Sequence, residues 1–437
     1  MNPGHTESTR LSAPRDNASS SVPSSTRSGW DSSTSADRPS TKRDGAPDSS
    51  RPVKPRRRLG LGARLPVLVA FAALLLVLVP ASSGAKKLPK EFFGVTQQTG
   101  VDTQDYKDMH KTKVRTLRLS LNWRGVEPQP GVFHWPDGRI GALADNGIRP
   151  LLSVFGAPAW ATGSNYGGTP PLKGKAKKAW KKFLKKAVKR YGPKGSFWKD
   201  HPNIKKKAVK SWQIWNEPNL PKYFGEIRNG QLRPIKKTAK SYAKLVKTSG
   251  KAIYKADKHA TVVLAGLSGN PKKKNMRPDK FLKKFFKVKK INKRFDAVAL
   301  HPYSPTIKKF KKVLKKTRKA MKKGHAKKKD LWLTEVGWGS AKEDHALTVG
   351  RQGQAKMLKK SFKYSVKKRK KYNIGRVYWF DWRDPARPNP VCSFCPTAGL
   401  EEFDRTHKPA FKQFKKFTRK QGGGGGGKHH HHHHHHH

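Results

Sequence analysis

The sequence predicts an α/β protein, a (β/α)8 TIM barrel, and three observations support this prediction. Eight short apolar runs occur along the chain, and most are continuously hydrophobic, as is typical of strands buried on both faces of a parallel sheet. Amphipathic helical patterns separate many of the runs. Together they occupy roughly 330 residues, which suits one barrel. The predicted strands are Phe92–Val95, Thr116–Leu121, Arg149–Phe155, Ser211–Trp215, Thr261–Gly266, Phe295–Leu300, Leu331–Thr334 and Arg376–Phe380.

The clearest helical pattern covers residues 176–191. Its apolar residues recur at i, i+3 and i+4, and lysine fills most of the remaining positions. Further helices are predicted over 236–257, 278–290, 307–323 and 352–371. We expect these helices to surround the barrel.

Both ends of the chain are excluded from the predicted barrel. Residues 1–58 are rich in Ser, Pro and Arg with almost no apolar content, so we expect them to be disordered. The tail, residues 422–437, consists of Gly, one Lys and nine His, and is either a linker with a purification tag or a natural metal-capturing tail. The barrel domain is therefore predicted over residues 86–421.

Residues 59–85 are predicted to be a signal peptide or a membrane anchor. Three arginines precede the apolar run Leu65–Val79, which is short for a membrane span of about 20 residues. Small residues allow cleavage after Ala85. The segment before the run is long for a signal peptide, so translation starts later, near Val53, or the run is an uncleaved anchor. Either alternative predicts a secreted or cell-surface barrel domain.

The stretch Ser211–Asn219 reads Ser-Trp-Gln-Ile-Trp-Asn-Glu-Pro-Asn and has a carboxylate where a strand should end. Pro218 disfavours helix at Glu217 and cannot continue the ladder of hydrogen bonds. Glu217 is therefore predicted to lie at the mouth of the barrel. The alternative is a glutamate that only caps a loop.

A second stretch, Asp330–Trp338, repeats this design with Glu335. The two carboxylates lie 118 positions apart on the predicted fourth and seventh strands. Because the active sites of such barrels lie at the carboxyl ends of the strands, both side chains should emerge on one face. Two carboxylates on one face can cleave a glycosidic bond.

These two stretches resemble known motifs. Trp212–Asn219 and Leu331–Trp338 are similar to the acid/base and nucleophile motifs of retaining glycoside hydrolases of clan A, above all family 39 and related bacterial polysaccharide endoglycosidases. The resemblance extends from about Phe92 to Phe414 and implies the same barrel. It further implies that Glu217 donates a proton to the glycosidic oxygen while Glu335 attacks the anomeric carbon, by double displacement. Nothing in the sequence requires a metal or another cofactor.

The resemblance also implies supporting residues. Asn216 matches an asparagine that binds a sugar hydroxyl, although it could instead stabilise a turn. Arg118 matches an arginine that keeps the nucleophile ionised, the alternative being a structural ion pair. His301 and Tyr303 match residues that lie against the nucleophile and the sugar, but His301 could also be a core histidine.

Aromatic residues at the predicted strand ends are candidates for stacking on sugar rings. Trp379 is the best match for the platform of the family, and core packing is the alternative for each of these residues. The remaining aromatic candidates are Trp123, Trp160 and Trp338. Weaker candidates for hydroxyl contacts are Gln98, Asn122 and Asp381.

Cys392 and Cys395 are the only cysteines. In an exported protein, this spacing favours a local disulfide that clasps the loop after the eighth strand. A redox motif or half of a zinc site would be the alternative in a cytosolic chain.

The charge of the predicted domain is extreme. Residues 86–421 carry 84 Lys and Arg against 22 Asp and Glu, a net charge of +62. We expect salt-dependent adsorption to polyanions such as teichoic or uronic polymers, acidic exopolysaccharide, anionic lipid or extracellular DNA. Specific nucleic-acid recognition is disfavoured because no known binding motif is present. Two functions follow: hydrolysis of a polysaccharide, or non-catalytic binding of anionic surface polymers by a basic barrel.

Overall fold

The computed structural model describes residues 86–422 except 99, 343–344 and 388–391. The predicted N-terminal region 1–58, the signal or anchor segment 59–85 and residues 423–437 of the tail lie outside the described residues. None of the helices in the described part combines the length and apolar character that a membrane span requires.

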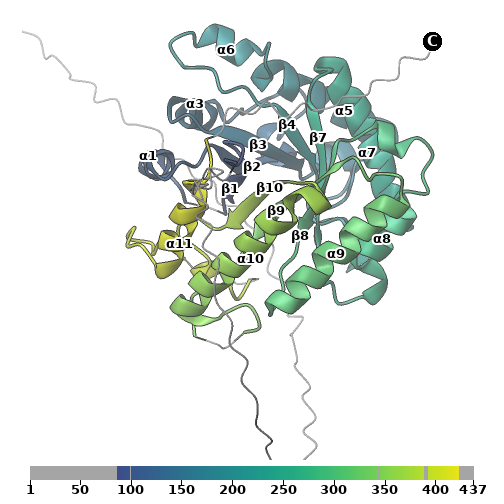
Figure 1. Ribbon diagram of the computed structural model, residues 1–437. Helices are drawn as coiled ribbons and strands as arrows, with labels where there is room; N and C mark the ends of the chain where they lie inside the picture. The colour runs from purple at the N-terminus through teal and green to yellow at the C-terminus, as the bar shows by residue number, and fades with distance from the viewer. Residues whose placement is uncertain (1–85, 99, 343–344, 388–391, 423–437) are drawn as a thin grey trace, which may run out of the picture. The chain divides into compact units, whose positions relative to one another are not determined.

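Eight parallel strands close into a barrel in the order β1-β10-β9-β8-β7-β4-β3-β2, so the predicted TIM barrel is confirmed (Figure 1). Every predicted strand has a counterpart, with ends that differ by up to two residues. The barrel strands are β1 (Phe93–Thr96), β2 (Thr116–Asn122), β3 (Arg149–Phe155), β4 (Ser211–Ile214), β7 (Thr261–Ser268), β8 (Ala297–His301), β9 (Asp330–Val336) and β10 (Ile374–Phe380).

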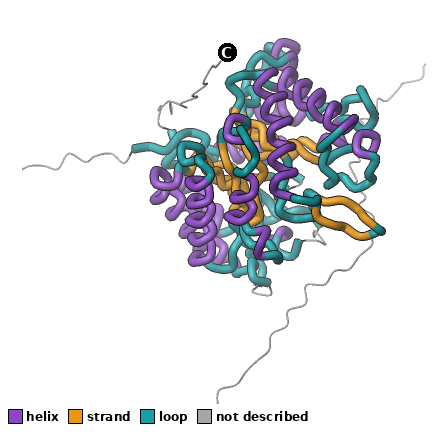
Figure 2. Tube along the Cα trace, turned by 90° about the vertical axis from the view of Figure 1, so that its right-hand side faces the viewer, coloured by secondary structure: helices purple, strands orange, loops and turns teal. Residues whose placement is uncertain are grey.

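Helices surround these strands, and a two-stranded hairpin stands apart from the barrel (Figure 2). The hairpin consists of β5 (Gly225–Arg228) and β6 (Gln231–Pro234). The long outer helices are α5 (Gly174–Tyr191), α7 (Thr238–Ala256), α8 (Pro278–Phe285), α9 (Ile307–Lys323) and α10 (Gly350–Tyr372). The others are α1 (Thr103–Lys111), α2 (Trp123–Val126), α3 (Asp137–Asp145), α4 (Ala159–Thr162), α6 (Ser196–Asp200) and α11 (Pro409–Thr418).

The lower part of the barrel interior is apolar. Its inward side chains form a separate buried cluster of Leu151, Val263, Ala297, Ala299, Trp332 and Tyr378. Above this cluster, other inward positions of the barrel carry polar side chains. They include Arg118 on β2, Ser153 on β3, Gln213 on β4 and Thr334 on β9, all buried. The barrel is therefore a packed apolar base with a polar layer beneath its mouth.

Candidate active site

The chain conformation after β4 directs Glu217 toward the barrel mouth. Trp215 and Glu217 have positive φ values of 73° and 36°, which are uncommon for residues other than glycine. The Asn219 side chain fixes the following loop, because its amide donates to the carbonyls of Ser268 and Met276 and its oxygen accepts from the amide N–H of Ser268. Glu217 thus lies three residues beyond the end of β4. This agrees with the expectation from Pro218 that the strand ends before Glu217.

Glu335 faces the interior because of a register shift in β9. Leu333 pairs with Val377 and Val336 pairs with Trp379, so two residues of β9 oppose one residue of β10. Such a bulge places consecutive side chains where strict alternation would separate them. Thr334 and Glu335 therefore both reach the polar interior, as their contacts with His301 show.

Arg118 joins four polar groups. Its Nη1 donates to Glu335 Oε1 over 2.8 Å, and its Nη2 donates to Asn216 Oδ1 over 3.0 Å. Its Nε donates to Gln213 Oε1 over 2.5 Å, while Nη2 also reaches Ser153 Oγ at 3.4 Å. A buried guanidinium in this arrangement fixes both the position and the charge of Glu335.

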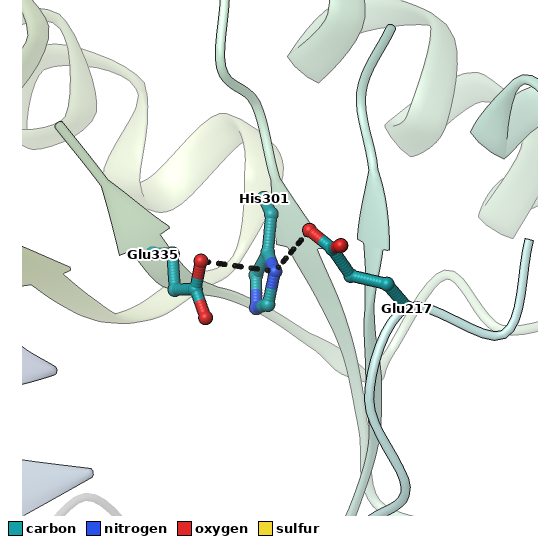
Figure 3. A group of neighbouring side chains, drawn as sticks. All are labelled: Glu217, His301 and Glu335. Carbon is teal, nitrogen blue, oxygen red and sulfur yellow. Dashed lines mark hydrogen bonds and ion pairs between the residues drawn. The ribbon is translucent and has the colours of Figure 1, made fainter. Parts of the chain in front are cut away.

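His301 lies between the two glutamates (Figure 3). Its Nδ1 is 2.9 Å from Glu217 Oε1 and 3.4 Å from Glu335 Oε2. The ring occupies space that a side chain at position 266 would take, since a Cβ on Gly266 would be 1.9 Å from His301 Nε2. Gly266 thus makes room for a fully buried imidazole.

The environment of Glu335 favours its ionised form. Burial raises the pKa of a carboxyl group, but His301, Arg118 and the Tyr303 hydroxyl together outweigh burial and hold the pKa of Glu335 below its usual 4.5. Tyr303 donates to Glu335 Oε2 over 2.7 Å. Burial and the charge of Glu335 raise the pKa of Tyr303 well above its usual value, so its hydroxyl remains a donor.

One oxygen of each glutamate and one nitrogen of His301 all lie within 4.8 Å of one another. This set of donors has the composition of a small metal site. However, both oxygens of Glu335 already accept hydrogen bonds, one from the Tyr303 hydroxyl and one from the Arg118 guanidinium over 2.8 Å. A cation would be repelled there, so these residues fit a metal ion poorly.

The predicted stacking roles of three tryptophans need correction. Trp379 and Trp123 are fully buried and Trp338 is 1% exposed, so none of them offers a ring face to a sugar. Trp379 packs outward against Trp338 and Phe362. Trp160 alone is partly exposed, and its role in binding stays a prediction.

The inward aromatic residue at this end of β10 is Phe380. Side chains alternate along a strand, and Tyr378 belongs to the inner apolar cluster, so Phe380 faces the same side. Its ring centroid is 6.3 Å from that of Tyr303. Because side chains two positions apart on a strand face the same side, an inward Tyr378 selects Phe380, and not Trp379, as the aromatic residue that faces the interior.

The weaker candidates occupy the rim of the barrel. Asp381 accepts from the Gln98 side chain at 3.1 Å and from the Trp382 N–H at 2.6 Å. Burial raises the pKa of Asp381 to about 7, so this carboxyl is partly protonated near neutral pH. The exposed Asn122 side chain caps α2 through the Arg124 N–H.

The predicted disulfide between Cys392 and Cys395 is confirmed. The enclosed Phe394 packs against Tyr303, with ring centroids 5.0 Å apart, and against Phe380 at 6.0 Å. The clasped loop therefore supports the tyrosine that binds Glu335.

The sequence interpretation missed Gln213 and Thr334. Gln213 Nε2 donates to the Leu264 carbonyl and to Thr334 Oγ1, and Thr334 Oγ1 lies 2.8 Å from His301 Nε2. The available signal was a polar residue inside an otherwise apolar run, as for Arg118. Such a residue must find a partner when it is buried.

A (β/α)8 barrel whose mouth holds one buried and one partly buried glutamate, the second bound by arginine and tyrosine, has the architecture of the barrel glycosidases. The sequence itself places this chain among them. It belongs to the family described as glycosyl hydrolase catalytic core, whose model matches residues 174–396. The matched part contains Glu217, His301 and Glu335.

Solved structures agree with the predicted resemblance to family 39, which is confirmed. The chain is similar to a family 39 glycoside hydrolase from Bacteroides cellulosilyticus WH2, with TM-score 0.55 and 20% identity, over 76% of this chain and 63% of the other. It also resembles a family 39 β-xylosidase from Caulobacter crescentus, with TM-score 0.55 and 18% identity, over 77% and 73% of the two chains. A third relative is an exo-β-1,4-mannosidase from an Opitutaceae bacterium, with TM-score 0.52 and 14% identity, over 78% and 60%.

This chain thus spans less than two thirds of the length of the Bacteroides protein. No curated protein matches the sequence.

Proposed function

We propose that the protein is a retaining glycosidase that acts on a polysaccharide by double displacement, with Glu217 as acid/base and Glu335 as nucleophile. The observation that carries this proposal is the short separation of the two carboxylates, whose nearest oxygens lie within 4.8 Å. Carboxyl groups about 5–5.5 Å apart suit direct attack on the anomeric carbon. An inverting enzyme needs about 6.5–9.5 Å to accommodate a water molecule.

The unequal hydrogen bonding of the two glutamates supports the assignment of their roles. Glu335 accepts from Arg118 and Tyr303, which stabilise a carboxylate ready to attack. Glu217 has only His301 as a side-chain partner within the described structure. Its second oxygen is left to carry the proton that the departing sugar oxygen requires.

A chain of hydrogen bonds supports a specific tautomer of His301. Gln213 Nε2 donates to Thr334 Oγ1, so the Thr334 hydroxyl proton is directed to His301 Nε2. His301 Nδ1 carries a proton in this neutral tautomer and in the charged ring alike, and it donates to Glu217 Oε1. This donation keeps the acidic proton of Glu217 on Oε2.

In the first step of the proposed mechanism, Glu335 bonds to the anomeric carbon while Glu217 protonates the departing oxygen. In the second step, Glu217 takes a proton from water, and the water oxygen displaces Glu335 from the sugar. Each step inverts the anomeric centre, so the overall configuration is retained. Asn216, held by Arg118, is suited to bind the hydroxyl next to that centre.

The test uses the purified full chain and the variants Glu217→Gln and Glu335→Gln. We expect reducing-end release from at least one polysaccharide in a panel of neutral and acidic polymers. Both variants should lose about 10³-fold or more in kcat. Glu127→Gln is the matched control, because Glu127 is also a buried glutamate but binds Trp123 Nε1 and the Gly131 N–H.

Azide distinguishes the two roles. Added to Glu217→Ala with an activated aryl glycoside, it should restore turnover and give a glycosyl azide of retained configuration. An inverted first product from the wild-type enzyme, seen by NMR, would contradict the mechanism. Binding without release across the panel would instead support the non-catalytic basic barrel.

We also propose that residues 86–421 work outside the cytoplasm. The disulfide Cys392–Cys395 supports this, because disulfides persist in oxidising compartments. The basic segment followed by Leu65–Val79 would direct export. Fractionation of cells that express the full chain tests the proposal, and a cytoplasmic barrel with free thiols would contradict it.

A further inference from the structure

Three neighbouring outer helices together carry a dense positive surface charge, whereas α5, with nine Lys and Arg and no Asp or Glu, carries a similar density on one helix. Between Ile307 and Lys323, α9 contains ten Lys and Arg and no Asp or Glu. Nine of these residues are exposed lysines, while Arg318 is buried. α10 likewise contains ten Lys and Arg and no acidic residue between Gly350 and Tyr372. In α8, Asp279 is the single acidic residue.

The charges of these helices form one continuous region, because α9 lies between α8 and α10 (Figure 1). We call this region the basic face and define it as the exposed lysines within 280–290, 308–323 and 356–371. Among the described ion pairs, none involves a lysine of the basic face. The charge is therefore not neutralised by the barrel itself.

The folding of α9 does not account for its lysines. Phe310, Leu314 and Met321 are fully buried on its inner side. On the outer side, like charges three and four residues apart repel one another and destabilise a helix. Lys311 does lie over the Tyr364 ring, at 5.1 Å from its centroid, but one such contact cannot explain nine exposed lysines. A polyanion along the face would relieve this repulsion.

The composition of the basic face indicates the chemistry of the partner. The exposed charge of α9 is lysine, which presents point charges without the planar fork that arginine uses to read defined groups. The large exposed hydrophobic residues of the described structure are Val132, Ile227, Leu232 and Phe403, and all lie outside the basic face. Tyr364 of α10 is partly exposed, but Lys311 and Lys368 lie over its ring. The face therefore offers neither a free stacking platform for bases nor an apolar edge for insertion into lipid.

The arginine inside the barrel mouth is not available for this recognition. Arg118 is the cation bound to Glu335, and its nitrogens already donate to Glu335, Gln213 and Asn216. An acidic polymer would thus find unused positive charge on the outer helices and not on Arg118.

We propose that the basic face is a binding surface for a linear acidic polysaccharide, distinct from the barrel mouth, and that it retains the protein on that polymer. Along one stripe of α9, the exposed lysines Lys308, Lys312, Lys315 and Lys319 recur about once per helical turn, roughly every 5.4 Å. This spacing allows many weak contacts with a polymer of regularly placed carboxylate or sulfate groups. Binding of this kind should weaken steeply with salt.

The test measures retention of the full chain on immobilised polygalacturonate and heparin over a range of salt concentrations. The variant changes Lys308, Lys312, Lys315 and Lys319 to Glu together, along one exposed stripe of α9. The matched control changes the exposed Lys177, Lys178, Lys182 and Lys189 of α5 to Glu, which alters the net charge equally on another helix. Thermal unfolding checks both proteins, and Lys→Gln versions replace any that do not fold.

We expect the α9 variant to bind at least tenfold more weakly at 150 mM salt and the α5 control less than threefold more weakly. Equal losses in both would mean that only net charge matters and would overturn the proposal. Tighter wild-type binding to duplex DNA or to phosphatidylglycerol vesicles than to the acidic polysaccharides would also overturn it. Because retention is measured without turnover, the result stands whether or not the proposed glycosidase activity is found.

Discussion

At the barrel mouth, a single arginine is shared among four polar side chains, whereas on α9 nine exposed lysines have no partner among the described ion pairs. Arg118 is buried, so its effect on Glu335 changes when any of its hydrogen-bond distances changes by a few tenths of an ångström or when any of its partners is replaced. The second set is solvated, and its effect depends on number and ionic strength. The comparison teaches that a net charge of +62 says little about the site, whose charges are balanced locally.

Removing Arg118 should give the largest effect. We expect Arg118→Gln to lower kcat by about 10²–10³-fold, because Glu335 loses its strongest donor. Arg118→Lys should restore part of the activity. The exposed Arg139 provides the control, Arg139→Gln, which removes the same charge with little effect.

The pH profile of Arg118→Gln separates its electrostatic role from a structural one. The pKa of Glu335 lies below 4.5, so ionised Glu335 stabilises the fold above that pH, and this stabilisation is lost as pH falls through the lowered value. Without Arg118, burial weighs more and the pKa of Glu335 rises. The acid limb of kcat/KM should therefore move to higher pH. An unchanged limb would contradict the proposed role.

Filling the space beside His301 tests whether the position of its imidazole ring affects kcat as strongly as the charge of Arg118 does. In Gly266→Ala, the new Cβ would meet the imidazole at 1.9 Å and displace it from Glu217. We expect kcat to fall by about 10²-fold, since small misplacements in an active site have effects of this size. Gly138→Ala is the control, because a Cβ there has no neighbour within 4 Å. Normal activity of Gly266→Ala with a displaced His301 would show that the histidine is dispensable.

Tyr303→Phe should have a smaller effect, about 10–10²-fold in kcat, equivalent to one hydrogen bond to a charged group. The chain contains a matched pair: Tyr303 donates to Glu335, and Tyr254 donates to Asp296, both over 2.7 Å. Both Tyr→Phe variants should lose similar thermal stability. Only Tyr303→Phe should lose activity, and equal activity losses would contradict a specific role.

Opening the disulfide should give the smallest effect. Replacing Cys392 and Cys395 by Ser removes a four-residue loop, worth about 2 kcal/mol in the chain-entropy model. Because Phe394 supports Tyr303, we expect kcat to fall a few-fold and the melting temperature by a few degrees. Kinetics and calorimetry without reductant would measure both, and a loss as large as that of Tyr303→Phe would mean that the loop holds more of the site.

Much of this arrangement could be predicted from local patterns. The eight strands and five long helices follow from apolar runs and periodicity, and Pro218 indicated where Glu217 would leave its strand. The register shift in β9 could not be predicted, because it depends on the pairing between two strands distant in sequence. The choice between Trp379 and Phe380 failed for the same reason: both are aromatic, and only the barrel decides which one faces inward.

The register shift in β9 also makes the site unusually dependent on strand length. Thr334 and Glu335 are adjacent in sequence, yet both reach the interior because one extra residue stands opposite β10. A deletion of one residue there would restore regular pairing and turn one of these side chains toward the helices. The glutamate could remain encoded in the chain while leaving the site. Over evolutionary time, such a strand should tolerate many substitutions on its outer face but few insertions or deletions.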